Sequence, residues 1–260
     1  TVWGYQEYED IYRAAWNVNR SRAPHSPPFR VLGLMYRARW DLLRPEDPDS
    51  ARAKVWTQGD PDAHMATVIL DAIRAGTQRL LVYSGSHHAF TKYLQPIYDS
   101  DTKHLVRLSD SRMGTLVARA LPGRTFTIFL HSPWTDPEDA LVRPAAGVID
   151  DALEGSGLGP VGFDLFGTPV GAVAVPDTYY AIGHPGFTVS DFADGWIWQK
   201  PFSQYEGCTV DQQFITPENF SEAVAFISNP RARAQFQSPA DLLDAMASDA
   251  DMHKRLRRLR

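Results

Sequence analysis

Three short turns of the sequence carry residue types that could perform catalysis or bind a cofactor. They are Ser84–His88 (SGSHH), His131–Trp134 (HSPW) and Met35–Arg37 (MYR). A neutral imidazole can bind a metal ion or accept a proton near neutral pH. A guanidinium group can stabilise negative charge that develops in a reaction. These residue types predict acid–base or metal-assisted chemistry, provided that the fold brings the turns together.

The adjacent histidines of the first turn are the strongest candidates. We expect His88 to act as a general base or a metal ligand and His87 to assist it. Gly85 precedes them and would let backbone N–H groups approach a bound anion or cofactor. The alternative is that one imidazole packs against a neighbouring sheet while the other caps a helix.

Three further residues are candidates for the same site. His131 would assist catalysis or bind a cofactor, but a single histidine after a strand is often a satisfied structural group. Arg37 would stabilise developing negative charge. His64 lies in the first turn of a predicted helix and is a candidate metal ligand, with an exposed helix-start histidine as the alternative.

The segments before these turns must be strands for the site to form. The runs 29–34, 79–83 and 126–130 are short and apolar, which is typical of buried strands. Helical spacing predicts helices over about the first twenty residues, from Pro61 to about Gly76, and from Arg112 to Leu121. This alternation predicts a mostly parallel sheet with helices on both faces. Ligands bind beyond the carboxyl ends of such strands, so the three turns would converge at one edge.

The second half of the chain has a weaker pattern. It predicts a helix over 145–154, a glycine-rich loop over 155–173, a late strand over 196–200, and helices over 216–227 and 239–259. We therefore predict a single α/β domain over residues 1–260, in which 135–260 forms a less regular extension with extra C-terminal helices.

Composition limits the function classes. The formal net charge of −5 argues against nucleic acid as a main partner, because phosphate binding needs a basic face. We expect no transmembrane segment, because no apolar run is long enough to cross a bilayer. Since the chain starts with Thr1, two localisations stay open: the cytoplasm, or export after removal of an upstream signal. The sequence contains no GxSxG elbow, HExxH motif, P-loop or GxGxxG after a strand.

Several short motifs together resemble a known superfamily. They are Asp62–Ala66 (DAHMA), Leu81–Ala89 (LVYSGSHHA) and Met113-Gly114. They are similar to motifs of the superfamily that joins erythromycin esterases, ChaN-like haem-uptake proteins and Tiki/TraB proteins, in which a helix with a D-x-x-M-A start precedes a strand ending in a G-x-x-H or H-N-x-H turn. On this pattern His88 takes the shared histidine position and Gly85 opens the motif.

The resemblance implies two functions for a chain whose partner is a small-molecule ligand or substrate. The first is a hydrolase of the erythromycin-esterase or Tiki type, with or without a divalent metal ion. The second is a ChaN-like protein that binds haem or a metal ion without catalysis. Nothing before Tyr5 matches the acidic-plus-histidine motif of the family's first strand, which favours a third alternative, a scaffold without the site. A homodimer is one alternative for the oligomeric state.

Overall fold

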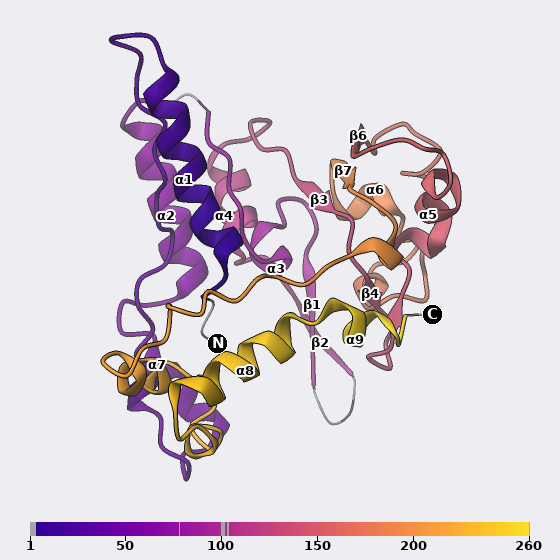
Figure 1. Ribbon diagram of the computed structural model, residues 1–260. Helices are drawn as coiled ribbons and strands as arrows, with labels where there is room; N and C mark the ends of the chain where they lie inside the picture. Colours follow the sequence, from indigo (N-terminus) through magenta and orange to yellow (C-terminus); the bar gives the residue numbers. More distant parts are fainter. Residues whose placement is uncertain (1–3, 78, 100–101, 103, 260) are drawn as a thin grey trace. The chain divides into compact units, whose positions relative to one another are not determined.

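The computed structural model describes residues 4–77, 79–99, 102 and 104–259, and Figure 1 labels its helices and strands. The chain divides into two compact units. The first contains the residues up to Pro61 together with Glu206–Met252, and the second contains Asp62–Tyr205 together with the residues after Met252. This division does not follow the boundary at residue 135 that the sequence suggested.

The first unit is built from helices and turns. Its α-helices are α1 (Gln6–Ser21), α7 (Phe220–Ala225) and α8 (Pro239–Ala250). Short 3-10 turns span Trp40–Leu42 (η1), Asp49–Val55 (η2) and Arg233–Gln235 (η6). The apolar faces of the helices meet in a small core made of Tyr5, Val210, Ile215, Ala223, Leu242 and Met246. The predicted first helix and the two predicted C-terminal helical regions are therefore confirmed.

The second unit mixes short helices and short strands. Its helices are α2 (Pro61–Arg74), α3 (Ser86–Ala89), α4 (Met113–Ala120), α5 (Val148–Leu153) and α6 (Val189–Phe192), and α9 (Met252–Leu256) follows near the end of the chain. Its strands are β1 (Gln95–Tyr98), β2 (Leu105–Ser109), β3 (Ile128–Leu130), β4 (Trp134–Thr135), β5 (Leu141–Val142), β6 (Val161–Asp164) and β7 (Gly195–Trp198). Turns of 3-10 helix span Pro144–Gly147 (η3), Tyr179–Ala181 (η4) and Phe202–Gln204 (η5).

Among the described residues the strands form three small sheets instead of one large one. The pairs β1–β2 and β4–β5 are antiparallel hairpins. In the third sheet β7 lies between β3, to which it is parallel, and β6, to which it is antiparallel. The predicted mostly parallel sheet with helices on both faces is therefore wrong, because β3–β7 is the one parallel pair among the described residues.

Two of the three predicted strands do not form. The segments 29–34 and 79–83 form neither helix nor strand and have no ladder partner among the described residues. The side chain of Asn19 occupies both backbone groups of Phe29, with distances of 2.7 Å to its N–H and 2.8 Å to its carbonyl oxygen. In the second segment, Leu81 is 87% exposed and Tyr83 is 64% exposed. An apolar run predicts burial, but a strand also needs a neighbour that takes its backbone hydrogen bonds.

The strands predicted over 126–130 and 196–200 both correspond to observed strands. The run 126–130 contains β3, and the predicted late strand over 196–200 overlaps β7. Phe129 and Trp196 are partners in the register of these two strands. The predicted glycine-rich loop is partly wrong, because β6 lies within it and pairs with β7.

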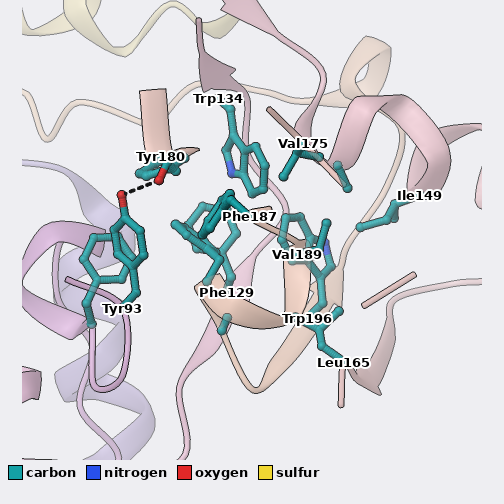
Figure 2. Close-up of a cluster of buried hydrophobic side chains, with 14 of the residues drawn as sticks. Tyr93, Phe129, Trp134, Ile149, Leu165, Val175, Tyr180, Phe187, Val189 and Trp196 are labelled. Carbon is teal, nitrogen blue, oxygen red and sulfur yellow. Dashed lines mark hydrogen bonds between the residues drawn. The ribbon is translucent and has the colours of Figure 1, made fainter. Parts of the chain in front are cut away.

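A cluster of aromatic rings forms the core of the second unit (Figure 2). Phe129 and Trp196 contribute from the mixed sheet, Trp134 from β4 and Phe192 from α6. The ring centroids of Phe129 and Phe192 lie 4.7 Å apart at an angle of 70°, the edge-to-face geometry that aromatic quadrupoles favour. Each ring buries a large apolar area, so this cluster contributes strongly to the stability of the unit.

Helix α2 matches its prediction closely. Met65 and Ile69 are buried and Ile73 is half-buried, as their spacing on one helix face indicates. Gly76 adopts a φ of +95° just after the helix, a conformation that glycine reaches without steric cost. Among the described residues, no helix is both long enough and apolar enough to span a membrane.

Candidate active site

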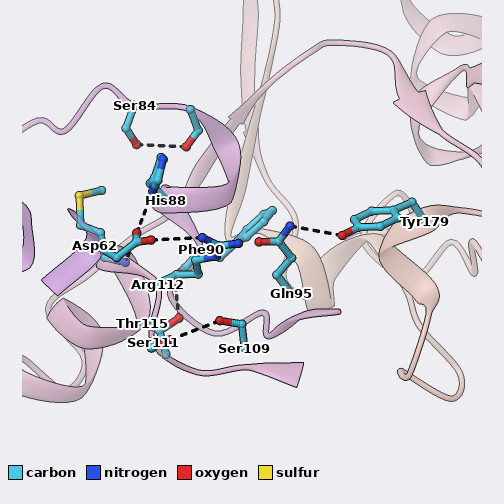
Figure 3. A network of polar contacts seen from close by, with 12 residues as sticks. Asp62, Ser84, His88, Phe90, Gln95, Ser109, Ser111, Arg112, Thr115 and Tyr179 are labelled. Atoms are coloured by element: carbon cyan, nitrogen blue, oxygen red, sulfur yellow. Dashed lines mark hydrogen bonds and ion pairs between the residues drawn. The ribbon is translucent and has the colours of Figure 1, made fainter. Parts of the chain in front are cut away.

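A buried carboxylate organises the start of three helices in the second unit (Figure 3). Asp62 lies in the first turn of α2, and its side chain is 6% exposed. Its Oδ1 atom lies 2.7 Å from Nδ1 of His88 and accepts the backbone N–H of Met113 at 2.8 Å. Its Oδ2 atom accepts a hydrogen bond from Nη1 of Arg112 at 3.2 Å. A single carboxylate thus joins α2 to the histidine turn and to the beginning of α4.

Close packing between α3 and α4 holds the histidine turn in place. A Cβ atom added to Gly114 would lie 2.5 Å from the carbonyl oxygen of Phe90 and 2.6 Å from that of Ala89, so only glycine allows this approach. Thr115 strengthens the contact, because its hydroxyl donates to the carbonyl of Phe90 at 3.1 Å. The Met113-Gly114 motif therefore has a structural role beside the histidines.

The contact with Asp62 determines how His88 can act. An ionised carboxylate can only accept, so the Nδ1 atom of His88 carries the proton. In the neutral ring this leaves a lone pair on Nε2, which can accept a proton from a bound molecule. The side chain of His88 is 37% exposed, and no hydrogen bond from the described residues engages Nε2. The geometry is that of a carboxylate-oriented general base.

Local electrostatics keep the site in a defined charge state. Burial alone would raise the pKa of Asp62, but the hydrogen bonds from His88, Met113 and Arg112 outweigh burial and lower it, so the carboxylate stays ionised. Desolvation lowers the pKa of His87, and the charges of Arg112 and His88 act in the same direction. Neutral His87 is the favoured form near pH 7.

A polar region surrounds Arg112. Its Nε atom is buried and has no partner among the described residues, and the same holds for Oε1 of Gln95. The Gln95 amide donates to the hydroxyl of Tyr179 at 3.3 Å. Burial raises the pKa of Tyr180 to about 12, although a hydrogen bond with Ser86 lowers this pKa by a smaller amount. Gln95 and Tyr179 are the uncharged polar residues on this side of Arg112, whose charge acts on Tyr179.

The residues around His88 do not fit a divalent metal ion. Both oxygen atoms of Asp62 already accept hydrogen bonds, and the adjacent Arg112 is a cation that would repel a second one. Within the described ranges, no group of three or more His, Cys, Asp or Glu side chains is placed to hold a metal ion. His64, the other predicted metal ligand, lies partly buried in the first turn of α2.

His131 lies in a different, fully buried environment. Its side chain has no exposed surface, and its Nε2 atom lies 2.8 Å from Oδ1 of Asp150, which is equally buried. Its Nδ1 atom accepts a hydrogen bond from the indole of Trp196 at 3.3 Å, and its ring stacks on Phe202. These contacts match the alternative that the sequence left open, a satisfied structural histidine.

The remaining predicted site residues have other surroundings. Arg37 belongs to the first unit, where it pairs with Glu222 at 2.7 Å and lies over the ring of Phe226. Gly85 precedes α3 with a φ of −58°, and its carbonyl accepts the N–H of His88 at 3.0 Å. A side chain at Gly85 would meet only His88, at 3.8 Å, so the turn imposes no steric need for glycine.

Sequence reasoning missed the two residues that complete the site. The sequence presents Asp62 only as part of the DAHMA motif, and Arg112 only as the beginning of a predicted helix. Asp62 occurs in the D-x-x-M-A motif, so its place in that motif was the available signal. Arg112 gave no comparable signal, because its pairing with Asp62 joins residues that are fifty positions apart.

Comparisons with known proteins leave the resemblance untested. No protein-family model, no curated protein and no solved structure matches the chain.

Proposed function

We propose that this chain is a hydrolase in which His88 acts as the general base. Asp62 orients the imidazole and fixes its tautomer, and Arg112 supplies a positive charge beside the pair. The similarity of the DAHMA and SGSHH motifs to the esterase and Tiki families supports the same assignment. The substrate class that these families imply is a small molecule with a hydrolysable acyl bond.

The observation that carries the proposal is the contact between Asp62 and Nδ1 of His88. A histidine with a purely structural role is usually satisfied at both ring nitrogens, as His131 is. His88 uses only one nitrogen and remains partly exposed. Its other nitrogen is therefore the group that can take a proton from water during hydrolysis.

The proposed reaction uses water as the nucleophile. Nε2 of His88 removes a proton from the water molecule while the water oxygen bonds to the acyl carbon of the substrate. Arg112 stabilises the negative charge that develops on the carbonyl oxygen. When the bond to the leaving group breaks, the imidazolium returns the proton to the departing oxygen or nitrogen atom, and the histidine is neutral again. Because the residues around His88 do not fit a metal ion, no step involves one.

A matched pair of variants tests this proposal. Hydrolysis of short-chain p-nitrophenyl esters by the purified chain would be compared with that by His88→Gln and by His253→Gln, an exposed histidine of α9. We expect His88→Gln to lower the rate by about 10²- to 10⁴-fold, the usual range for a general base, and His253→Gln to leave it unchanged. Dialysis against a chelator should not alter the rate. Equal rates for both variants would refute the assignment.

Haem or metal binding without catalysis stays a prediction from the resemblance alone. Its test is an absorbance scan and a metal analysis of the purified chain. A Soret band would favour the ChaN-like alternative and contradict the hydrolase proposal.

A further inference from the structure

We propose that a hollow in the first unit binds a phosphate group, independently of the site at His88. The hollow has a volume of about 160 Å³ and lies between residues 43–52 and residues 229–231. Arginines line it from both sides: Arg44 and Arg52 from the first segment and Arg231 from the second.

Hydrogen bonds to backbone carbonyls hold the two walls together. Nε of Arg231 donates to the carbonyl of Pro45 at 2.9 Å. Arg233 donates to the carbonyl of Leu43 at 2.9 Å and to that of Ile227 at 3.1 Å, so it ties the same two segments together. Prolines at 45, 48 and 230 restrict the backbone further. The hollow is thus largely preformed, which lowers the entropic cost of binding.

Arginines outnumber carboxylates among the described residues that line the hollow. Arg44, Arg52 and Arg231 line it together with a single described carboxylate, that of Asp47. One oxygen of Asp47 is occupied by the N–H of Arg44 at 2.7 Å and by the ammonium group of Lys54. No described residue accepts a hydrogen bond from the guanidinium of Arg44 or from the Nη atoms of Arg231. These groups can therefore donate to a bound oxyanion.

The chemistry and the size of the hollow both select phosphate. Guanidinium groups bind phosphate oxygens through paired, charge-assisted hydrogen bonds. The side chain of Asn229 accepts the N–H of Arg231 at 3.0 Å, which leaves its amide N–H groups as further donors. The volume is below the range of roughly 300–1,000 Å³ that holds a drug-sized ligand. The hollow can take inorganic phosphate or the phosphoryl end of a small monoester, but not a whole nucleotide.

Calorimetric titration of the full chain at constant ionic strength tests the proposal. Sodium phosphate and glycerol 3-phosphate would be titrated separately, because tighter binding of one of them identifies the source of the phosphoryl group. We expect saturable binding that weakens about tenfold or more in Arg44→Gln and in Arg231→Gln, since each change removes charged hydrogen bonds. Arg44→Lys should weaken binding less, because the charge remains. Arg22→Gln, an exposed change after α1, should bind like the unaltered chain.

Two results would overturn the proposal. The first is the lack of saturable binding of both compounds at concentrations up to about 10 mM, a range in which even weak sites fill. The second is binding that weakens equally in Arg22→Gln and in the two variants of the hollow, which would indicate a general effect of net charge. Melting temperatures of all variants show whether each is folded under the conditions of the titration.

Discussion

The change Asp62→Asn tests whether one carboxylate holds the candidate site together. Asparagine keeps the shape of the side chain and one carbonyl oxygen, which can still accept from His88 and Met113. Its amide nitrogen, however, would face the guanidinium of Arg112. The ion pair between Asp62 and Arg112 would then be replaced by two hydrogen-bond donors that face each other. The change therefore removes a charge at a site where the side chain is only 6% exposed.

The magnitude follows from the burial of the partners. Removing one member of a buried ion pair costs about 3–5 kcal/mol, because the other charge is left without compensation. The side chains of Arg112 and His88 are 24% and 37% exposed, so water screens part of the lost attraction. We therefore expect the lower end of that range, about 3 kcal/mol at neutral pH. Asp71→Asn, which breaks an exposed pair with Arg74 on the same helix, should cost no more than about 0.5 kcal/mol.

Urea unfolding at several pH values supplies the measurement. The pKa of Asp62 is lowered in the folded chain, so its stabilisation is complete above the unfolded value of about 3.9 and is lost as pH falls through the folded value. The difference in unfolding free energy between the unaltered chain and Asp62→Asn should thus narrow below about pH 4. A difference that is the same at pH 3 and pH 7, or that is no larger than for Asp71→Asn, would refute the reasoning.

Three further predictions concern stability. His131→Ala should lower the free energy of unfolding in urea by at least about 3 kcal/mol, because it leaves the buried carboxylate of Asp150 without its partner. A loss as small as that caused by the exposed change His253→Ala would contradict the buried contact between His131 and Asp150. Gly114→Ala should cost about 1–3 kcal/mol because of the clash with the carbonyl of Phe90, whereas Gly33→Ala, where a Cβ meets nothing within 4 Å, should be nearly neutral. Folding lowers the pKa of His87, so the unfolded chain binds a proton at this imidazole more readily, and the free energy of unfolding should fall as pH drops below about 6.5. His87→Gln should make the free energy of unfolding depend less on pH in this range. An unchanged pH dependence would show that other groups cause it.

Local patterns predicted the helices well and the sheet poorly. The apolar stripe of α2 and its glycine stop are properties of neighbouring residues, and both occur as expected. Strand pairing depends on residues far away in the sequence. The run 29–34 has the composition of a buried strand, yet the side chain of Asn19 takes backbone hydrogen bonds that a neighbouring strand would have needed. Composition alone contains no information on such a competitor.

The candidate site was partly accessible from the sequence for a similar reason. His87 and His88 stand out because two adjacent imidazoles follow a glycine in one turn. The prediction that Arg37 and His131 join them depended on a shared edge of a parallel sheet, and that sheet does not form. Asp62 and Arg112 reach His88 through helix starts instead, an arrangement that the strand-end rule does not consider.

The two histidine–aspartate pairs of the second unit differ in what their second ring nitrogen does. Nδ1 of His131 accepts the indole N–H of Trp196, so this ring is neutral, its proton lies on Nε2, and both nitrogens are engaged. Such a ring can neither take up nor release a proton without breaking a buried hydrogen bond. His88 pairs with Asp62 through Nδ1 alone, at a partly exposed position. A carboxylate partner is common to both pairs and therefore does not identify a base. The ring nitrogen that no described residue engages distinguishes His88, and it supports the proposed role of this residue in proton transfer.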